Sequence, residues 1–200
     1  GRIFESVDKY AALRALKAID RSDVVLLLID GEQGILDQDK HVAGYAFDAH
    51  KAIIVVVNKW DLVKKDQDAM ADFSKTIRDE CKFLEFAPIV FVSAKNKTRI
   101  KTIFDSIILA YEGYTTRVST SLLNDILQDA QIMNPTPHFN GGRLKIYYAN
   151  QVEIKPPTFV LFVNNPDYMH FSYKRYLENR LRDTFHFEGT PIHMITRMRK

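Results

Sequence analysis

The chain has few of the features that secreted and membrane proteins use. Cys81 is its only cysteine, so no disulfide can form within the chain, and we expect a reducing compartment. The longest apolar runs, around 24–29 and 52–57, are far shorter than the roughly 20 residues that span a bilayer. We recognise no signal peptide. These absences predict a cytoplasmic protein with no membrane partner.

A phosphate-binding loop is also missing from the sequence. None of the eight glycines lies in a Gly-x-x-x-x-Gly-Lys-Ser/Thr pattern, and Gly141-Gly142 is followed by Arg143-Leu144. No Asp-x-x-Gly follows a predicted strand, and the six histidines lack metal-ligand spacing. We find no nucleophile paired with a base. The sequence therefore predicts no catalytic residue, no Mg²⁺ ligand and no other metal site in this chain.

The composition allows one large or two small domains. Apolar residues make up 46% of the 200 positions, which is enough for buried cores. The net charge of +3 is uneven along the chain. Residues 1–113 hold 17 Lys and Arg against 18 Asp and Glu, whereas residues 114–200 hold 11 against 7. This asymmetry indicates two domains with different partners.

The first domain alternates helical and strand patterns. Runs rich in β-branched residues, typical of strands buried on both faces, lie at 24–29, 53–57 and 88–92. Helical spacing recurs at 7–18, 35–50, 69–84 and 100–111, and in the last of these we expect Ile103, Phe104, Ile107 and Ile108 to face inward. The alternation predicts an α/β domain, a parallel sheet with helices on both faces. Right-handed crossovers would bring the loops after the strands to one edge.

After a connector at 114–119 the pattern changes. Helical segments at 122–130 and 172–187 and strands at 144–151, 158–164 and 192–195 predict a small α+β domain. Its basic residues beside exposed aromatic ones suggest RNA contact, with phosphates supplying affinity. Lys and Arg also simply solvate helix surfaces, and a net charge of +4 in 87 residues is modest.

Asn58-Lys59-Trp60-Asp61 follows the second strand at once, where ligands of parallel sheets bind. Guanine presents two adjacent donors, the ring N–H and the exocyclic amine, and the Asp61 carboxylate can accept both. Adenine has an acceptor in place of the ring donor. Hydrogen bonds to a charged group are worth about 1.5–3 kcal/mol each, so two give discrimination on the order of a hundredfold or more. Asn58 can join neighbouring loops, and the Lys59 stem can lie against the base.

Four such residues can also be an ordinary turn and helix start. A second motif favours guanine recognition, because the strand at 88–92 ends in Ser93-Ala94-Lys95. This is the companion loop of GTPases, in which the Ala94 N–H would meet the guanine carbonyl and Ser93 would brace Asp61. The two motifs together predict a GTP- or GDP-binding site.

The whole sequence resembles the downstream part of the bacterial Der (EngA) GTPases, which carry two GTPase domains and a C-terminal KH-like domain. The resemblance rests on both guanine motifs, on Gln38-Asp39 after Asp30-Gly31, and on three closing segments. These segments are 156–166, Ser172-Tyr173-Lys174-Arg175-Tyr176-Leu177-Glu178-Asn179 and Gly189-Thr190-Pro191-Ile192.

The resemblance implies that residues 1–113 are the C-terminal part of a P-loop-type GTPase domain and residues 116–200 a KH-like domain. It implies GTP hydrolysis by the full-length protein with Mg²⁺, and a cytoplasmic, ribosome-associated role in large ribosomal subunit assembly. Its partners would be ribosomal RNA and the upstream GTPase domains. Asn58, Lys59 and Asp61 would bind the base, Ser93 and Ala94 would support it, and Lys95 would close over it.

Two departures from the family pattern remain. The phosphate-binding half is not in this sequence, so we expect this chain alone to be inactive. The Gly-x-x-Gly loop of ordinary KH domains is also missing, so either any RNA contact is made differently or the domain mainly packs against GTPase domains. The alternative is a non-enzymatic RNA- or protein-binding module in which the α/β half is a scaffold.

Overall fold

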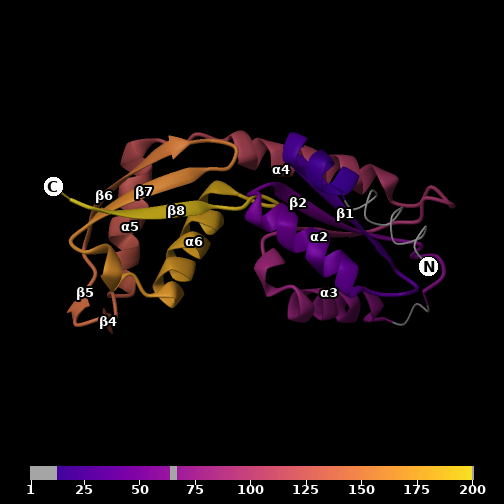
Figure 1. Ribbon diagram of the computed structural model, residues 1–200, viewed down its shortest axis with the longest axis horizontal. Coiled ribbons are helices and arrows are strands. Elements are labelled where there is room, and N and C mark those ends of the chain that lie inside the picture. The colour runs from indigo at the N-terminus through magenta and orange to yellow at the C-terminus, as the bar shows by residue number, and fades with distance from the viewer. Residues whose placement is uncertain (1–12, 64–66, 200) are drawn as a thin grey trace. The chain divides into compact units, whose positions relative to one another are not determined.

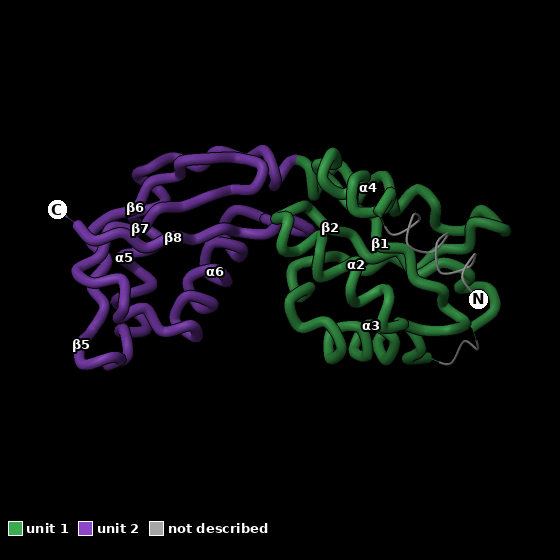
Figure 2. The backbone as a smooth tube through the Cα atoms, viewed as in Figure 1, with its two compact units in different colours: residues 1–111 green, residues 112–200 purple. Residues whose placement is uncertain are grey.

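The computed structural model describes residues 13–63 and 67–199, and it divides into two compact units at the bond between Tyr111 and Glu112 (Figure 2). The first unit contains a helical stretch at 13–21 and then β1 (Val24–Asp30), α2 (Asp37–Asp48), β2 (Ala52–Asn58), α3 (Ala69–Glu80), β3 (Ile89–Phe91) and most of α4 (Ile100–Thr115). Residues 7–12 of the predicted first helix lie outside the described residues.

The three strands of the first unit form a parallel sheet in the order β1-β2-β3. The central strand is the most buried, because residues 52–57 expose between 0% and 2% of their surface. Helices α2 and α3 lie on one side of the sheet and α4 lies on the other (Figure 1). The sequence prediction of an α/β sheet with helices on both faces is confirmed.

Burial on both faces was predicted for β1 as well, and this is wrong for one face. Leu26 and Leu28 are 37% and 59% exposed, whereas the alternate residues Leu27 and Ile29 are buried. In α4, Phe104 and Ile108 were expected to face inward but are 60% and 56% exposed. The apolar pattern of a strand or helix therefore shows which of its faces can be buried. It does not show whether another part of the structure covers that face.

The predicted helix at 69–84 ends early. Its backbone leaves the helical region at Cys81 (φ −129°, ψ 66°), and residues 82–84 form a short 3₁₀ turn, η1 (Lys82–Leu84). The Arg78 guanidinium donates hydrogen bonds to the carbonyl groups of Leu84 and Ala87. These bonds satisfy carbonyl groups at and beyond the end of the 3₁₀ turn.

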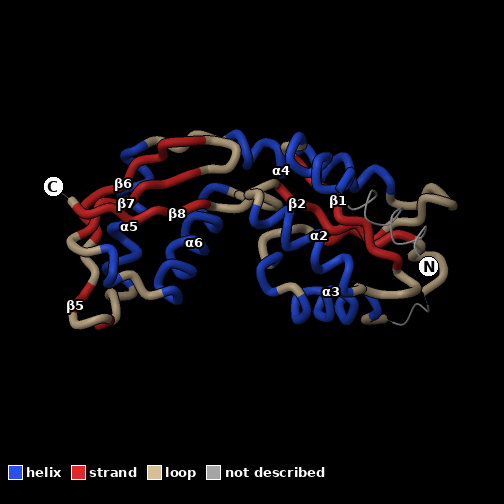
Figure 3. The backbone as a smooth tube through the Cα atoms, in the orientation of Figure 1, coloured by secondary structure: helices blue, strands red, loops and turns tan. Residues whose placement is uncertain are grey.

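The second unit contains two main helices and one three-stranded sheet. Its elements are α5 (Thr120–Met133), β4 (His138–Phe139), β5 (Gly142–Arg143), β6 (Ile146–Glu153), β7 (Thr158–Val163), η2 (Pro166–Tyr168), α6 (Phe171–Phe185) and β8 (His193–Met198). The sheet order is β6-β7-β8, with β6 antiparallel and β8 parallel to β7. Both helices pack on the same side of this sheet (Figure 3). The predicted α+β arrangement is confirmed.

The core of the second unit lies between the helices and one face of the sheet. Phe159, Leu161 and Val163 of β7 and Leu177 and Leu181 of α6 are all fully buried in one cluster. Burying one such side chain stabilises the fold by about 1.5–3 kcal/mol. This alternation along β7 fixes which of its residues point to the opposite face.

Two local features differ from the prediction. Helix α4 extends to Thr115 because Tyr114 is buried at 2% exposure, so the connector is shorter than expected. The β4–β5 hairpin was not predicted at all. Its turn is Asn140-Gly141, with φ of 50° and 85°, and this residue pair is a recognised hairpin signal.

The outer edge of β6 is covered by two side chains of α5. The Asn124 amide donates to the carbonyl of Ala149 (2.9 Å) and accepts its N–H (2.8 Å). Gln131 forms the same pair of bonds with Ile146, at 3.3 and 3.0 Å. Since unpaired strand edges attract other strands, these amides protect β6 from edge pairing.

Candidate guanine-binding site

The loop after β2 is held by backbone bonds from both neighbouring strands. The Gly31 N–H, just after β1, donates to the carbonyl oxygen of Asn58 at 2.8 Å. On the other side the Trp60 N–H donates to the carbonyl of Val92 at 3.0 Å. The parallel sheet thus brings the ends of all three strands together, as the sequence predicted, and fixes the loop between them.

The two guanine motifs are joined directly. The Asn58 side-chain oxygen accepts the backbone N–H of Ala94 at 3.0 Å. This bond confirms that Asn58 joins neighbouring loops. It also occupies the N–H that was expected to meet the guanine carbonyl. A base bound in the predicted way would share this N–H with Asn58 or replace it as acceptor.

Ser93 closes the second loop on itself. Its backbone exchanges hydrogen bonds with Thr98 at 3.2 and 3.0 Å, and its hydroxyl oxygen accepts the N–H of Asn96 at 3.1 Å. Ser93 is buried, whereas Ala94 and Lys95 are exposed at the tip of this loop. The bracing of Asp61 by Ser93 and the closure by Lys95 stay predictions.

Lys59 adopts the left-handed backbone conformation (φ 59°), which is uncommon for a residue with a side chain. Its ammonium group forms an ion pair with the Asp30 carboxylate at 2.6 Å. The hydrogen bond from Lys59, followed by the N–H of Glu32, lowers the pKa of Asp30, and the same bond to Asp30 raises the pKa of Lys59. The pair holds Lys59 at the edge of the sheet.

Asp30 was not among the predicted site residues. Its carboxylate also accepts the N–H of Glu32 at 2.9 Å, which orients it within the loop after β1. The signal that could have found it is its position at the carboxyl end of a strand that pairs with β2, in the same register as Asn58. The sequence predicted the strand at 24–29 but not its pairing with β2.

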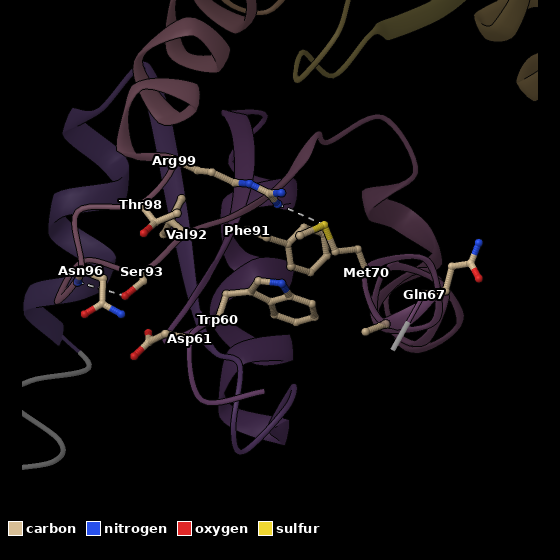
Figure 4. Close-up of a pocket in the computed structure, with 11 residues that line it drawn as sticks. Trp60, Asp61, Gln67, Met70, Phe91, Val92, Ser93, Asn96, Thr98 and Arg99 are labelled. Atoms are coloured by element: carbon tan, nitrogen blue, oxygen red, sulfur yellow. Dashed lines mark hydrogen bonds between the residues drawn. The ribbon is translucent and has the colours of Figure 1, made fainter. Parts of the chain in front are cut away.

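A cavity of about 340 Å³ adjoins the two loops (Figure 4). Its lining includes Asp61 and Ser93, but not the other four predicted residues, Asn58, Lys59, Ala94 and Lys95. Figure 4 shows Asp61 and Ser93 on one side of the Trp60 ring and Met70 on the other. The remaining lining residues are Gln67, Ala69, Phe91, Val92, Asn96, Thr98 and Arg99.

The Trp60 ring forms the apolar wall of this cavity. It is 5% exposed and packs against Phe73 and Phe91, with ring centroids 5.6 and 4.4 Å away.

Within residues 13–63 and 67–199 no group of three or more His, Cys, Asp or Glu side chains could hold a metal ion. No helix in the described part of the chain is long and apolar enough to cross a membrane.

Residues 13–112 match the family described as the elongation factor Tu GTP binding domain. Residues 117–197 match the KH-domain-like C-terminal domain of EngA bacterial GTPase enzymes. The chain belongs to the Der (EngA) family of GTPases. It is 58% identical to GTPase Der of Bacillus mycoides (strain KBAB4) and 56% identical to GTPase Der of Bacillus thuringiensis (strain Al Hakam), over 199 residues in each case.

These Der relatives are longer than this chain. The match covers 100% of the chain but 46% of each relative. A crystal structure of Era from Aquifex aeolicus bound to GDP·AlF4⁻ has a TM-score of 0.43 and 15% identity, over 92% of this chain and 67% of that one. This similarity is too low to support an argument about function.

Proposed function

We propose that the protein is a GTP-binding and GTP-hydrolysing ribosome biogenesis factor, located in the cytoplasm on the ribosome and acting in large-subunit assembly. The first unit would supply guanine recognition. The observation that carries this proposal is the bond from the Ala94 N–H to the Asn58 side chain at 3.0 Å, which joins the two guanine motifs beside Asp61. Membership of the Der family supports the activity of the full-length protein.

In this proposal Asp61 accepts hydrogen bonds from the ring N–H and the amine of guanine. The Lys59 stem lies along one face of the base, held by its ion pair with Asp30. Lys95 covers the opposite face, and Ser93 supports Asp61. When the base binds, its carbonyl oxygen competes with Asn58 for the Ala94 N–H, because one N–H cannot donate fully to both.

Mg²⁺ and the phosphates would be bound by residues outside this sequence. The sequence contains no Gly-x-x-x-x-Gly-Lys-Ser/Thr pattern, and among the described residues no group of three or more His, Cys, Asp or Glu side chains could hold a metal ion. We therefore infer that this chain alone binds GTP or GDP weakly, through the base, and hydrolyses neither. Hydrolysis would need the upstream GTPase domains of the family.

Exposed apolar residues in the first unit favour such a partner. Leu26 and Leu28 of β1 and Phe104 and Ile108 of α4 are all large, apolar and exposed. Since exposed apolar surface favours association, we infer that the upstream part of the protein covers them. Adding the upstream part of the Bacillus mycoides relative should slow amide hydrogen exchange in β1. Unchanged exchange in a saturating mixture would contradict this.

The test of the guanine site is the substitution Asp61→Asn, both in this chain and in a fusion with the upstream part of the Bacillus mycoides relative. The variant should lose affinity for GTP by about a hundredfold or more, because two hydrogen bonds to a charged group are lost. It should gain affinity for xanthosine triphosphate, whose ring carries a carbonyl in place of the amine. In this chain Trp60 fluorescence reports binding, since Trp60 is its only tryptophan and lines the cavity.

The matched control is Asp105→Asn, which removes an exposed carboxylate from α4 and should leave both affinities unchanged. An unchanged preference for guanine in Asp61→Asn would refute the role of Asp61. If the fused wild-type protein responds to no nucleotide but binds RNA with a steep salt dependence, the non-enzymatic binding module is the better account.

A further inference from the structure

Partly exposed aromatic rings lie on the sheet face of the second unit that points away from its core. Phe159, Leu161 and Val163 of β7 face the core, so Phe162 points to the other side. There its ring stacks on Tyr148 of β6, with centroids 4.4 Å apart and planes 16° apart. Tyr148 is 39% exposed. This stack is a flat apolar platform that a planar ligand can extend.

Three exposed cations lie on the strands that carry this platform or next to the ends of those strands. Arg197 of β8 is the register partner of Phe162, on the side opposite Tyr148. Lys145 and Arg199 lie over the ring of Tyr147, at 5.2 and 4.9 Å from its centroid. None of the three takes part in an ion pair within residues 13–63 and 67–199.

Backbone bonds and contact with the Tyr147 ring position two of these cations, Lys145 and Arg199. The Arg199 N–H donates to the carbonyl of Val163 at 2.9 Å, and the Lys145 N–H donates to the side chain of Asn164 at 2.8 Å. Attraction to the face of the Tyr147 ring offsets the repulsion between the two like charges. We call Lys145, Tyr147, Tyr148, Arg197 and Arg199 the β6–β8 patch.

A hollow of about 370 Å³ adjoins the β6–β8 patch. Lys145, Tyr147 and Tyr148 form its strand side, while Gln128 and Ile132 lie on its α5 side. Helix α5 also exposes Asp125 and Asp129, which lie three residues before and one residue after Gln128. An anionic chain would therefore run along the strand side, and a neutral planar group would enter the hollow.

We propose that the β6–β8 patch binds single-stranded RNA, an inference that rests on the ribosome-associated role in the proposed function. Lys145, Arg197 and Arg199 contact phosphates, and an unstacked base extends the Tyr148–Phe162 stack. Aromatic platforms beside cations bind single strands in this way. The patch replaces the Gly-x-x-Gly loop that the chain lacks. An acidic peptide would use the cations but gain nothing from the aromatic stack.

The first test is the triple variant Lys145→Gln, Arg197→Gln and Arg199→Gln. The probe is a fluorescein-labelled, mixed-sequence single-stranded RNA of roughly a dozen nucleotides, within the range of known single-strand sites. If each cation neutralises one phosphate, the slope of log affinity against log salt should fall by about 2, and affinity at 0.1 M salt by about a hundredfold. Fluorescence anisotropy at several salt concentrations measures both quantities.

The control is Lys75→Gln, Lys82→Gln and Lys101→Gln, three exposed lysines of the first unit. It changes the net charge by the same amount, so it separates the position of the charges from their number. It should keep the wild-type slope. Equal losses in both triple variants, or no RNA binding by the wild-type chain, would overturn the proposal.

The second test separates RNA from an acidic protein. Tyr148→Leu should weaken RNA binding about fivefold or more by removing a stacking surface, whereas Tyr148→Phe should bind as the wild type does. Polyglutamate that binds as tightly as the RNA, with no effect of Tyr148→Leu on either, would identify an acidic protein instead. Nucleotide binding followed by Trp60 fluorescence should stay unchanged in all these variants, so failure here and failure of the guanine site are distinguishable.

Discussion

Replacing Gly31 by alanine should destabilise the first unit. A Cβ atom at this position would lie 2.8 Å from the carbonyl oxygen of Asn58 and 3.3 Å from methyl carbons of Val57 and Val63. The closest of these is a backbone atom that already accepts the Gly31 N–H at 2.8 Å. It cannot rotate away as a side chain would, so the end of β2 that carries Asn58 has to move.

The magnitude follows from two contributions. Overpacking a well-packed site costs about 1–3 kcal/mol. Weakening the hydrogen bond from Gly31 to Asn58 adds about 0.5–1.5 kcal/mol. We expect the free energy of unfolding of the first unit to fall by about 2–4 kcal/mol. Because the moved residue precedes Lys59 and Asp61, affinity for guanine nucleotides should fall as well.

The control is the same substitution at Gly44, in the middle of α2. Apart from its chain neighbours and the nearby backbone of α2 itself, no atom lies within 4 Å of a Cβ at that position. Alanine favours a helix over glycine by about 0.5–1 kcal/mol, so Gly44→Ala should stabilise the unit. Urea denaturation followed by the fluorescence of Trp60 measures both variants. Two variants of equal stability would refute the close contact between Gly31 and Asn58.

Three further predictions concern single residues. Leu177→Ala, in the core of the second unit, should lower its free energy of unfolding by about 2–5 kcal/mol, measured by circular dichroism in urea. Burial raises the pKa of Glu178, so the wild-type chain loses stability as pH rises through that pKa. Glu178→Gln should therefore have a higher melting temperature than the wild type at pH 7. This gain should vanish below the ordinary glutamate pKa, where the wild-type side chain is protonated. The hydrogen bond from Lys59 lowers the pKa of Asp30, so this ion pair stabilises the fold above the ordinary aspartate pKa. The stabilisation is lost as pH falls through the pKa of Asp30 in the folded state. In thermal melts at falling pH, Asp30→Asn should not show this loss of stability.

Patterns that are local in sequence predicted the elements well. The β-branched run at 53–57 identified the central strand, and the two motifs after strands identified loops that are joined in space by Asn58 and Ala94. Asp30 was missed because its role depends on which strand pairs with β2, and this is set by contacts between distant segments. The exposure of Phe104 depends on a covering layer, which helical spacing cannot reveal.

The spacing of the two side-chain amides on α5 matches the spacing of their backbone partners on β6. Asn124 and Gln131 are seven residues apart, which is about 10.5 Å along a helix. Their partners Ala149 and Ile146 are three residues apart, about 10 Å along a strand. Residues three apart on a regular strand point their backbone groups to opposite edges, so the irregularity between Ile146 and Tyr148 is what turns both to the same side.

This match makes the lengths of the two elements interdependent. One residue inserted between Asn124 and Gln131 would turn the later amide by about 100° around the helix and break one of its two pairs. Removing the irregularity in β6 would turn the backbone groups of one partner away from α5. Relatives of this domain should therefore differ in length mainly in their loops. They should either keep both the seven-residue interval in α5 and the three-residue interval in β6, or have neither.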